Sequence, residues 1–244
     1  GMGYIGSHTA LALLNDGHEV TILDNLINSN ISVLHSIKSI SSIEPNFVQG
    51  DVLDTATLKD ALQKFDINSV IHFAGLKAVG ESVLQPFMYY KNNIQGTISL
   101  IDAMLSCNIK TLVFSSSATV YGVPDYLPID EKHPINAQSP YATSKAGSDQ
   151  LALSYYKSFN TPISIIRPFN TYGPRQSLRA IIPTIICQML DSKTNIIKLG
   201  NLEISRDFNY ISDTVDGFMS CLKSKKILGE VINIGSVRNI IKIS

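Results

Sequence analysis

Apolar residues in this chain form short runs that alternate with longer stretches in which apolar positions recur every three or four residues. The short runs are typical of buried strands, and the longer stretches of amphipathic helices. The predicted strands span residues 19–23, 46–49, 69–73, 111–114, 162–167, 195–199 and 231–235. The predicted helices span residues 7–16, 31–43, 55–65, 86–107, 141–159, 180–190 and 213–223, with Ser212 or Asp213 capping the last. This alternation predicts an α/β fold with a doubly wound parallel sheet that presents ligand sites at the carboxyl ends of its strands.

A glycine-rich turn opens the chain, immediately before the first predicted helix. Gly1, Gly3 and Gly6 fit the pattern Gly-x-Gly-x-x-Gly, which permits a tight turn and lets a pyrophosphate approach a helix N-terminus. The strand at 19–23 then ends at Asp24, about the expected distance downstream. A carboxylate there accepts hydrogen bonds from both ribose hydroxyls and repels a 2′-phosphate, which favours NAD over NADP. The alternative is that Asp24 is only a turn former or cap ahead of Asn25.

A row of hydroxyl groups follows the strand at 111–114, and a Tyr-x-x-x-Lys pair opens the helix at 141–159. The row runs from Ser115 through Ser116 and Ser117 to Thr119. Tyr141 and Lys145 are four residues apart, so they share a helix face, where the ammonium lowers the pKa of the phenol. A base is most effective when its pKa approaches the working pH. Alone, such a pair is usually an ordinary surface pair, but its position near the hydroxyl row favours proton transfer.

Composition narrows the classes of partner. Twenty basic and twenty acidic residues give a formal net charge of zero, with no block of like charge, which argues against nucleic acid or anionic lipid as a partner. The three cysteines lack metal-ligand spacing and indicate reduced thiols in a cytosolic protein without a bound metal: Cys107, Cys187 and Cys221. No apolar run is long enough to cross a bilayer, so no membrane association is expected.

Two further kinds of residue invite a functional interpretation. His72 lies on an apolar strand, where a buried core histidine is a better interpretation than a catalyst. Arg167, Arg175, Arg179 and Arg206 gather in a region otherwise poor in charge, as a phosphate-bearing substrate would require. The alternative of ordinary surface arginines is acceptable for Arg167 and Arg179 and less so for Arg206.

Taken together, these motifs resemble those of the extended short-chain dehydrogenases/reductases that act on nucleotide sugars. The chain from Gly1 to about Phe159, and residues 73–82 and 115–122 in particular, resembles the UDP-glucose (UDP-galactose) 4-epimerases of that family. Residues 167–176 are more similar to the nucleotide-sugar 4,6-dehydratases and uronate epimerases. The resemblance implies a UDP-sugar substrate and NAD as cofactor.

The resemblance also implies roles for individual residues. The residues expected to hold NAD are Gly1, Gly3, Tyr4, Ile5, Gly6, Asp24, Asn25, Asp51, Val52, Phe73, Ala74, Gly75, Lys77, Asn92, Ser115, Tyr141 and Lys145. The residues expected to act in catalysis are Tyr141, Lys145, Ser117 and Thr119. The residues expected to contact substrate are Lys77, Ser117, Tyr141, Asn170 and Arg206, the last two at the diphosphate. Lys145 would contact the nicotinamide ribose and tune Tyr141, and Ser117 would hydrogen-bond the sugar O4.

Two reactions open with the same step, in which the tyrosine removes the O4 proton while hydride leaves C4 for NAD⁺. A dehydratase must then eliminate water across C5 and C6, and the family's dehydratases carry an Asp-Glu pair where this chain has Ala118 and Thr119. Neither of these residues is an acid or base at neutral pH. We therefore expect 4-epimerisation, with 4,6-dehydration as the alternative. A non-catalytic NAD-binding regulator or inactive fragment is a further alternative, which the intact Ser117, Tyr141 and Lys145 oppose.

The resemblance divides the chain into a NAD-binding Rossmann domain, residues 1–168, and an incomplete substrate-binding lobe, residues 169–244, with segments that return to the sheet. It implies a strand before Gly1 and a segment after Ser244, so we expect a chain truncated at both ends. Loss of a central strand leaves two unpaired edges, which predicts marginal folding of the isolated chain. We also expect a cytoplasmic location and, in the full-length parent, a homodimer formed through residues 86–107 and 141–159.

Overall fold

The computed structural model of the protein describes the chain except residues 110, 194, 201, 203–204, 237–239 and 243–244. The strands are β1 (Thr21–Asp24), β2 (Asn46–Gln49), β3 (Ser69–His72), β4 (Thr111–Ser115), β5 (Ile163–Pro168), β6 (Asn170–Tyr172), β7 (Ser205–Tyr210), β8 (Val231–Ile234) and β9 (Ile240–Lys242). The α-helices are α1 (Tyr4–Asn15), α2 (Ser32–Ser41), α3 (Thr55–Lys64), α4 (Val79–Leu84), α5 (Pro86–Tyr89), α6 (Gly96–Ser106), α7 (Pro140–Phe159), α8 (Ile181–Leu190) and α9 (Ile211–Lys223). Shorter helical segments are the π-helix η1 (Tyr90–Gln95) and the 3₁₀ helices η2 (Ala118–Tyr121) and η3 (Lys225–Ile227).

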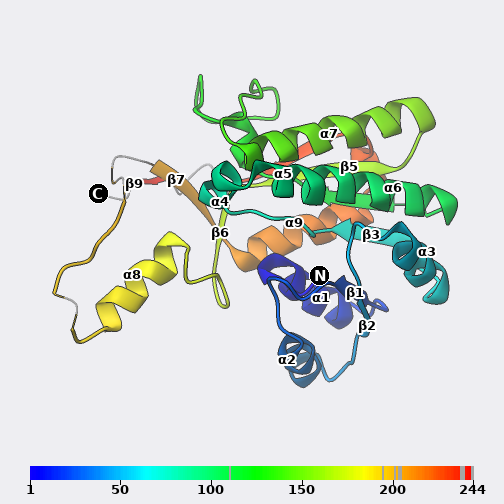
Figure 1. The fold of residues 1–244 in the computed structure, drawn as a ribbon, viewed down its shortest axis with the longest axis horizontal. Coiled ribbons are helices and arrows are strands. Elements are labelled where there is room, and N and C mark those ends of the chain that lie inside the picture. The colour runs from blue at the N-terminus through cyan, green and yellow to red at the C-terminus, as the bar shows by residue number, and fades with distance from the viewer. Residues whose placement is uncertain (110, 194, 201, 203–204, 237–239, 243–244) are drawn as a thin grey trace.

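Helices cover both faces of a parallel sheet, as the alternating pattern predicts. Four parallel strands stand in the order β3-β4-β5-β8, and β1 and β2 form a separate parallel pair. In Figure 1, α4 to α7 lie on one side of these strands and α1, α2 and α9 on the other. A third sheet, β6-β7-β9, lies towards α8 and the C-terminus (Figure 1). The predicted α/β fold with a parallel sheet is confirmed.

Two apolar clusters hold the sheet between its helix layers, and β4 contributes to both. Successive side chains of a strand point to opposite faces. Leu112 and Phe114 therefore join the cluster formed with α3, α6 and α7, whereas Val113 packs with Ile166 and Phe218 beneath α9. All five side chains are at most 1% exposed, and full burial of such a side chain stabilises the fold by about 1.5–3 kcal/mol. This packing fixes the strand end at which the hydroxyl row begins.

An apolar cavity separates the β1-β2 pair from the four-stranded parallel sheet. It has a volume of about 430 Å³ and is lined by residues of both β1 and β3, among them Ile22, Leu23, Val70 and Ile71. Within the described part of the chain, β1 pairs only with β2, and β3 only with β4. The predicted pair of open strand edges is confirmed. Marginal folding of the isolated chain stays a prediction, as does the domain division at residue 168.

Four local predictions are wrong in instructive ways. Residues 195–199 form no strand, because the amide and carbonyl of Lys198 bond the side chain of Gln188 instead of a neighbouring strand. No strand is predicted between residues 168 and 176 or around Arg206, but the first segment contains the short strand β6 and the second forms β7. The long helix predicted at 86–107 is divided by η1 into α5 and α6. Neither Ser212 nor Asp213 caps α9, since that helix begins after Tyr210 without a side-chain cap.

The remaining predicted helices and strands agree with the structure within a few residues at their ends. Among the helices of the described residues, none combines the length and apolar character needed to span a bilayer.

Candidate active site

The glycine-rich turn forms an open cradle at the N-terminus of α1. A Cβ atom on Gly6 would collide with the carbonyl oxygen of Gly1, and one on Gly1 would collide with the Asp24 carboxylate. A Cβ on Gly3 would meet no atom within 4 Å. Gly3 is also the N-cap of α1 and provides no side-chain cap, so the first N–H groups of the helix remain available to a ligand. Tyr4 and Ile5 belong to that first turn, and the arrangement suits a phosphate group.

Asp24 lies at the carboxyl end of β1 and is held in place by three hydrogen bonds. Its Oδ2 accepts from the backbone N–H of Met2, and its Oδ1 accepts from the N–H of Leu26 at 2.8 Å and the hydroxyl of Ser29 at 2.7 Å. Each carboxylate oxygen can accept more than one hydrogen bond, so a ribose can still be bound. The structure therefore places a carboxylate beside the glycine cradle, where a dinucleotide requires one.

Two further predicted cofactor residues follow β2. Asp51 accepts a hydrogen bond at 2.8 Å from Nδ2 of Asn25, which joins the ends of β1 and β2. Val52 is 6% exposed and packs closely on Gly96. A Cβ atom on Gly96 would lie only 2.6 Å from Cγ1 of Val52. Asp51 and Asn25 thus share one edge of the site, whereas Val52 supports it from the core.

The loop after β3 carries Phe73, Ala74 and Gly75 towards α7. Phe73 packs on Phe218 with ring centroids 4.7 Å apart. A Cβ on Gly75 would lie only 3.2 Å from Nζ of Lys145. A small residue is needed at this position because a larger one would displace the ammonium group.

Asn93 is a site residue that sequence reasoning missed. It is 2% exposed, accepts from the N–H of Leu76 at 2.9 Å, and donates to the carbonyl of Leu76 at 3.0 Å and to the hydroxyl of Ser144 at 2.8 Å. It therefore fastens the loop after β3 to α7. The predicted residue, Asn92, donates to the Asn93 side chain. Two adjacent asparagines in an otherwise apolar helix indicate that one of them has a buried polar contact. The π-helical register of η1 decides that the buried one is Asn93.

The hydroxyl row and Tyr141 meet at the end of β4. Ser117 is the N-cap of η2, and its hydroxyl lies 2.8 Å from that of Thr119. Burial raises the pKa of Tyr141, and a hydrogen bond with the Ser117 side chain opposes the rise. Tyr141 is 8% exposed, and its ring stands edge-on to Tyr89. Three predicted catalytic residues are thus brought together.

Lys145 lies one helical turn from Tyr141 and is only 6% exposed. Its ammonium donates to the carbonyl of Ser115 at 2.9 Å and lies 5.2 Å from the ring centroid of Phe114. Burial lowers the pKa of Lys145 to about 8, and Asp149 opposes the shift. The group therefore stays mainly protonated at neutral pH. The expected lowering of the pKa of Tyr141 is not the net result, because burial of the phenol dominates and the net shift is upward.

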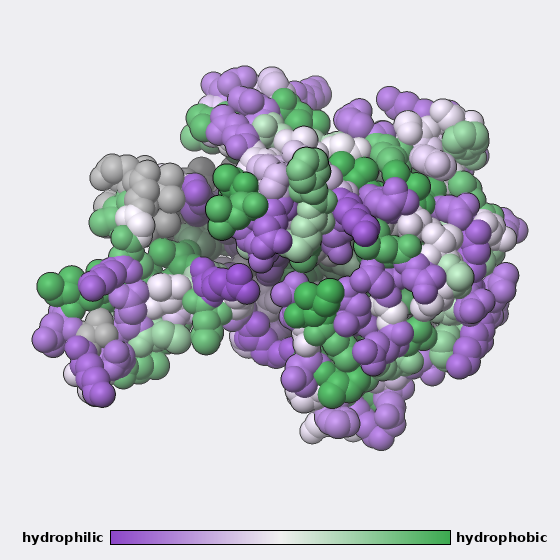
Figure 2. Space-filling view, viewed as in Figure 1, coloured by the Kyte–Doolittle hydropathy of each residue, from purple (hydrophilic) through white to green (hydrophobic). Residues whose placement is uncertain are grey.

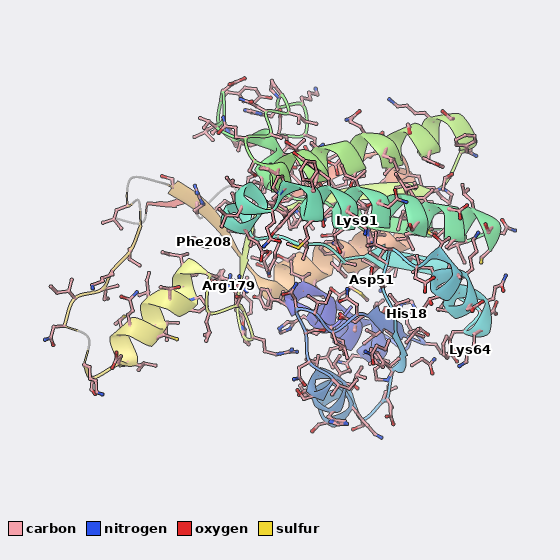
Figure 3. The ribbon with its side chains drawn as sticks, in the orientation of Figure 1. His18, Asp51, Lys64, Lys91, Arg179 and Phe208 are labelled. Atoms are coloured by element: carbon pink, nitrogen blue, oxygen red, sulfur yellow. The ribbon has the colours of Figure 1, made fainter. Side chains whose placement is uncertain are left out.

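Positive charge gathers where the loop after β3 faces the C-terminal lobe. Nζ of Lys77 lies 5.9 Å from the ring centroid of Tyr4. Desolvation and the charge of Arg179 both lower the pKa of Lys77. Figure 3 places Arg179 on the side of the α8 lobe that faces the body of the protein. Arg179 is exposed, as the surface interpretation expects, and its charge is near enough to Lys77 to lower the pKa of that group.

The predicted diphosphate contacts lie on the small sheet β6-β7-β9. Asn170 begins β6 and pairs in register with Phe208 of β7, two residues beyond Arg206. Nδ2 of Asn170 donates to the carbonyl of Asp207 at 3.3 Å, and Nη1 of Arg206 donates to the carbonyl of Ser205 at 3.0 Å. Both side chains are exposed. The sheet brings these two residues together, away from the helix that carries Tyr141.

The structure decides two interpretations of charged residues. His72 is 5% exposed, and burial lowers its pKa to about 3, with a smaller contribution from Lys145, so it is a neutral core histidine as predicted. Arg167 is no surface arginine, because it is 3% exposed and forms an ion pair with the fully buried Asp149. A charge inside a buried strand requires such a partner.

Comparison with known proteins agrees with this geometry. Residues 1–244 match the family model described as GDP-mannose 4,6-dehydratase. A UDP-glucose 4-epimerase of Yersinia enterocolitica is 38% identical over 254 residues, which cover 97% of this chain and 76% of the relative.

Two solved structures share the fold over almost the whole chain. The UDP-glucose 4-epimerase of Stenotrophomonas maltophila, with bound NAD and formylated UDP-arabinopyranose, superposes with a TM-score of 0.92 at 31% identity and covers 100% of this chain and 78% of that one. A dTDP-glucose 4,6-dehydratase of Streptomyces venezuelae with NAD bound superposes with a TM-score of 0.87 at 30% identity and covers 96% of this chain and 73% of that one. The resemblance predicted from the motifs is therefore confirmed, and the chain belongs to the nucleotide-sugar epimerase and dehydratase family of extended short-chain dehydrogenases/reductases.

Proposed function

We propose that this protein catalyses the NAD-dependent 4-epimerisation of a UDP-hexose through a transient 4-keto intermediate. One observation carries the proposal: a buried tyrosine meets the hydroxyl of Ser117, which is itself bonded to that of Thr119, with no carboxylate at positions 118 and 119. The relatives named UDP-glucose 4-epimerase give independent support.

The residues of the NAD site fit a dinucleotide. The α1 N-terminus and Gly3 would receive the pyrophosphate, and Asp24 would accept the hydroxyls of a ribose. Lys145, beside Gly75 and the carbonyl of Ser115, would hold the nicotinamide ribose. When bound, NAD⁺ supplies a reversible hydride acceptor for C4 of the sugar.

The protein's own groups manage the proton. Tyr141 takes the proton of the O4 hydroxyl and returns it, and Ser117, bonded to Thr119, orients that hydroxyl. Burial keeps the pKa of Tyr141 high, so the phenolate has to be stabilised by the hydrogen bond with Ser117 and by nearby positive charge. The diphosphate would be bound by Asn170, Arg206 and Lys77. The hexose would remain free to rotate, so that hydride can return to its other face.

A 4,6-dehydratase is the second candidate, and two comparisons favour it. The family model carries a dehydratase description, and a dehydratase is among the structural relatives. The hydroxyl row opposes it, because Ala118 and Thr119 occupy η2 where that reaction requires an acid and a base.

Assembly and location complete the proposal. The apolar side chains of Leu84, Phe87 and Phe159 are 82%, 84% and 66% exposed, and the last two lie on the segments expected to pair in a homodimer. We propose that this surface joins two copies of a cytoplasmic enzyme. Sedimentation of the protein should give twice the monomer mass, and replacement of Phe87 by Glu should return the monomer.

A substrate panel tests the proposed reaction. The protein is incubated with NAD⁺ and, in turn, UDP-glucose, UDP-N-acetylglucosamine and UDP-glucuronate, and the products are separated by chromatography. A C4 epimer of any one substrate is the expected result. A 4-keto-6-deoxy product would replace the proposal with dehydration, and no turnover, together with NAD binding, would favour a non-catalytic role.

A further inference from the structure

A buried ion pair lies beneath the catalytic helix, and the proposed chemistry does not use it. Arg167 of β5 donates from Nη2 and Nε to Oδ2 of Asp149 of α7, at 2.9 Å and 3.0 Å. The two side chains are 3% and 0% exposed. Removing two charges from water costs several kcal/mol each, so a buried pair is no better for stability than apolar residues of similar size. A role beyond stability therefore has to be considered.

Helix geometry links Asp149 to the catalytic pair. Tyr141, Lys145 and Asp149 follow one another at intervals of four residues on α7, which places them along one face. The negative charge of Asp149 raises the pKa of both Tyr141 and Lys145. The ionisation of the phenol thus depends on a carboxylate two turns away.

Arg167 also reaches the element that carries the hydroxyl row. Its Nη1 donates to the hydroxyl of Tyr121 at 2.9 Å, and its guanidinium carbon lies 5.0 Å from the centroid of that ring. The Tyr121 hydroxyl donates in turn, at 2.8 Å, to Oδ1 of Asn233, which belongs to β8 of the same sheet. Tyr121 is the last residue of η2, the turn that follows Ser117 and contains Thr119. One guanidinium therefore bonds α7 on one side and η2 on the other.

We propose that Asp149 and Arg167 are positioning residues for proton transfer. The ion pair, continued through Tyr121, holds α7 against η2 so that the Tyr141 phenol meets the hydroxyl of Ser117, which is bonded to that of Thr119. The positive charge of Arg167 balances the Asp149 carboxylate. It thereby limits the amount by which the carboxylate raises the pKa of Tyr141 and destabilises the phenolate. The role in proton transfer rests on the proposed 4-epimerisation. The link between α7 and η2 through Arg167 does not depend on which reaction the protein catalyses.

The first test separates the charge from the contact. Asp149→Asn removes the carboxylate and leaves Arg167 charged, so the pKa of Tyr141 falls. In a plot of kcat against pH, the acid limb then moves to lower pH by about one pH unit. Asp149→Asn with Arg167→Met removes both charges and returns the limb to the wild-type position. Tyr121→Phe removes the bond between Arg167 and η2, together with the Tyr121–Asn233 bond, and leaves the ion pair in place. We expect kcat to fall about tenfold, KM to stay within about twofold, and the limb not to move.

Controls distinguish positioning from a purely structural role. Asp60→Asn, an exposed acid on α3, leaves kcat and the pH profile unchanged. Thermal unfolding and NAD binding show that each variant is folded. The proposal is overturned if Asp149→Asn and Tyr121→Phe lower the melting temperature but leave kcat and the acid limb at wild-type values.

A second readout needs no turnover. Ultraviolet titration of tyrosinate, taken as the difference between the wild type and Tyr141→Phe, follows the Tyr141 phenol directly. Asp149→Asn should lower its midpoint, and the double variant should restore it. If the midpoint falls in Asp149→Asn but the protein does not epimerise its substrate, only the proposed function is overturned. If the midpoint is unchanged, the electrostatic part of the positioning role is overturned.

Discussion

The catalytic helix α7 and the C-terminal lobe around α8 hold their functional side chains in opposite ways. Tyr141 and Lys145 are 8% and 6% exposed, and each is bonded to or packed against the end of β4. Asn170 and Arg206 are exposed, and the bonds that their side chains make to other described residues go to backbone carbonyls. Proton transfer requires groups placed within a fraction of an ångström, whereas binding of a diphosphate tolerates adjustment. The molecule therefore holds the proposed proton-transfer groups rigidly and presents the proposed substrate contacts on an open surface.

The same contrast appears in packing. α7 contacts β5, η1 and η2, whereas α8 has no buried residue. Ile186, Met189 and Leu190 of α8 are 50%, 68% and 80% exposed, and apolar side chains are visible over this lobe in Figure 2. Changes in the two regions should accordingly differ in both size and kind.

The largest effect is expected at the phenol. Tyr141→Phe should lower kcat by about 10²–10⁴-fold, because general acid–base catalysis supplies a factor of that size. KM and NAD affinity should change little, since the ring keeps its contact with Tyr89. Steady-state kinetics and NAD titration measure both. Near-normal turnover would show that another group accepts the proton.

Packing gives the next contrast. Ile166→Ala should lower the free energy of unfolding by about 2–5 kcal/mol, because the side chain is completely buried in the sheet. Met189→Ala, on the exposed face of α8, should lower it by less than about 0.5 kcal/mol. Urea unfolding of the two variants makes the comparison. Equal losses would mean that α8 is packed as firmly as the sheet.

The exposed substrate contacts should affect binding more than the chemical step. Arg206→Leu should raise KM for the UDP-sugar by about ten- to hundredfold, the range expected for a lost hydrogen bond to a charged group. Its kcat should stay within about threefold. Leucine at Lys193, another exposed cation of the lobe, is the matched control. A fall in kcat without a change in KM would place Arg206 with the rigid group instead.

The loss of stability at low pH should arise from the buried His72 and not from an exposed histidine. Burial lowers the pKa of His72 to about 3. Because the unfolded chain takes up a proton below about pH 6.5 and the folded chain does not, this residue reduces stability as the pH falls. The loss between pH 7 and pH 5 is about 2 kcal/mol. His72→Gln should remove most of this loss, and His35→Gln, at an exposed histidine, should not. Urea unfolding at the two pH values decides.

Sequence patterns predicted the sheet and its strand ends because those depend on local runs of apolar residues. The glycine cradle, Asp24 and the pairing of Tyr141 with the hydroxyl row also followed, since each rests on short spacing at a strand end. The missed features depend on contacts between distant residues. Whether Arg167 was buried depended on Asp149 eighteen positions away, and the choice between Asn92 and Asn93 depended on a π-helical turn. The upward shift in the pKa of Tyr141 came from burial that no spacing reveals.

The fate of the hydrogen on C4 tests the central claim most directly. The protein is incubated with NAD⁺ and a UDP-hexose that carries deuterium at C4, and the product is examined by nuclear magnetic resonance. Epimerisation by Tyr141 and Ser117, with neither an acid nor a base at positions 118 and 119, predicts the C4 epimer with deuterium retained at C4. Deuterium at C6 of a 4-keto-6-deoxy sugar would contradict it.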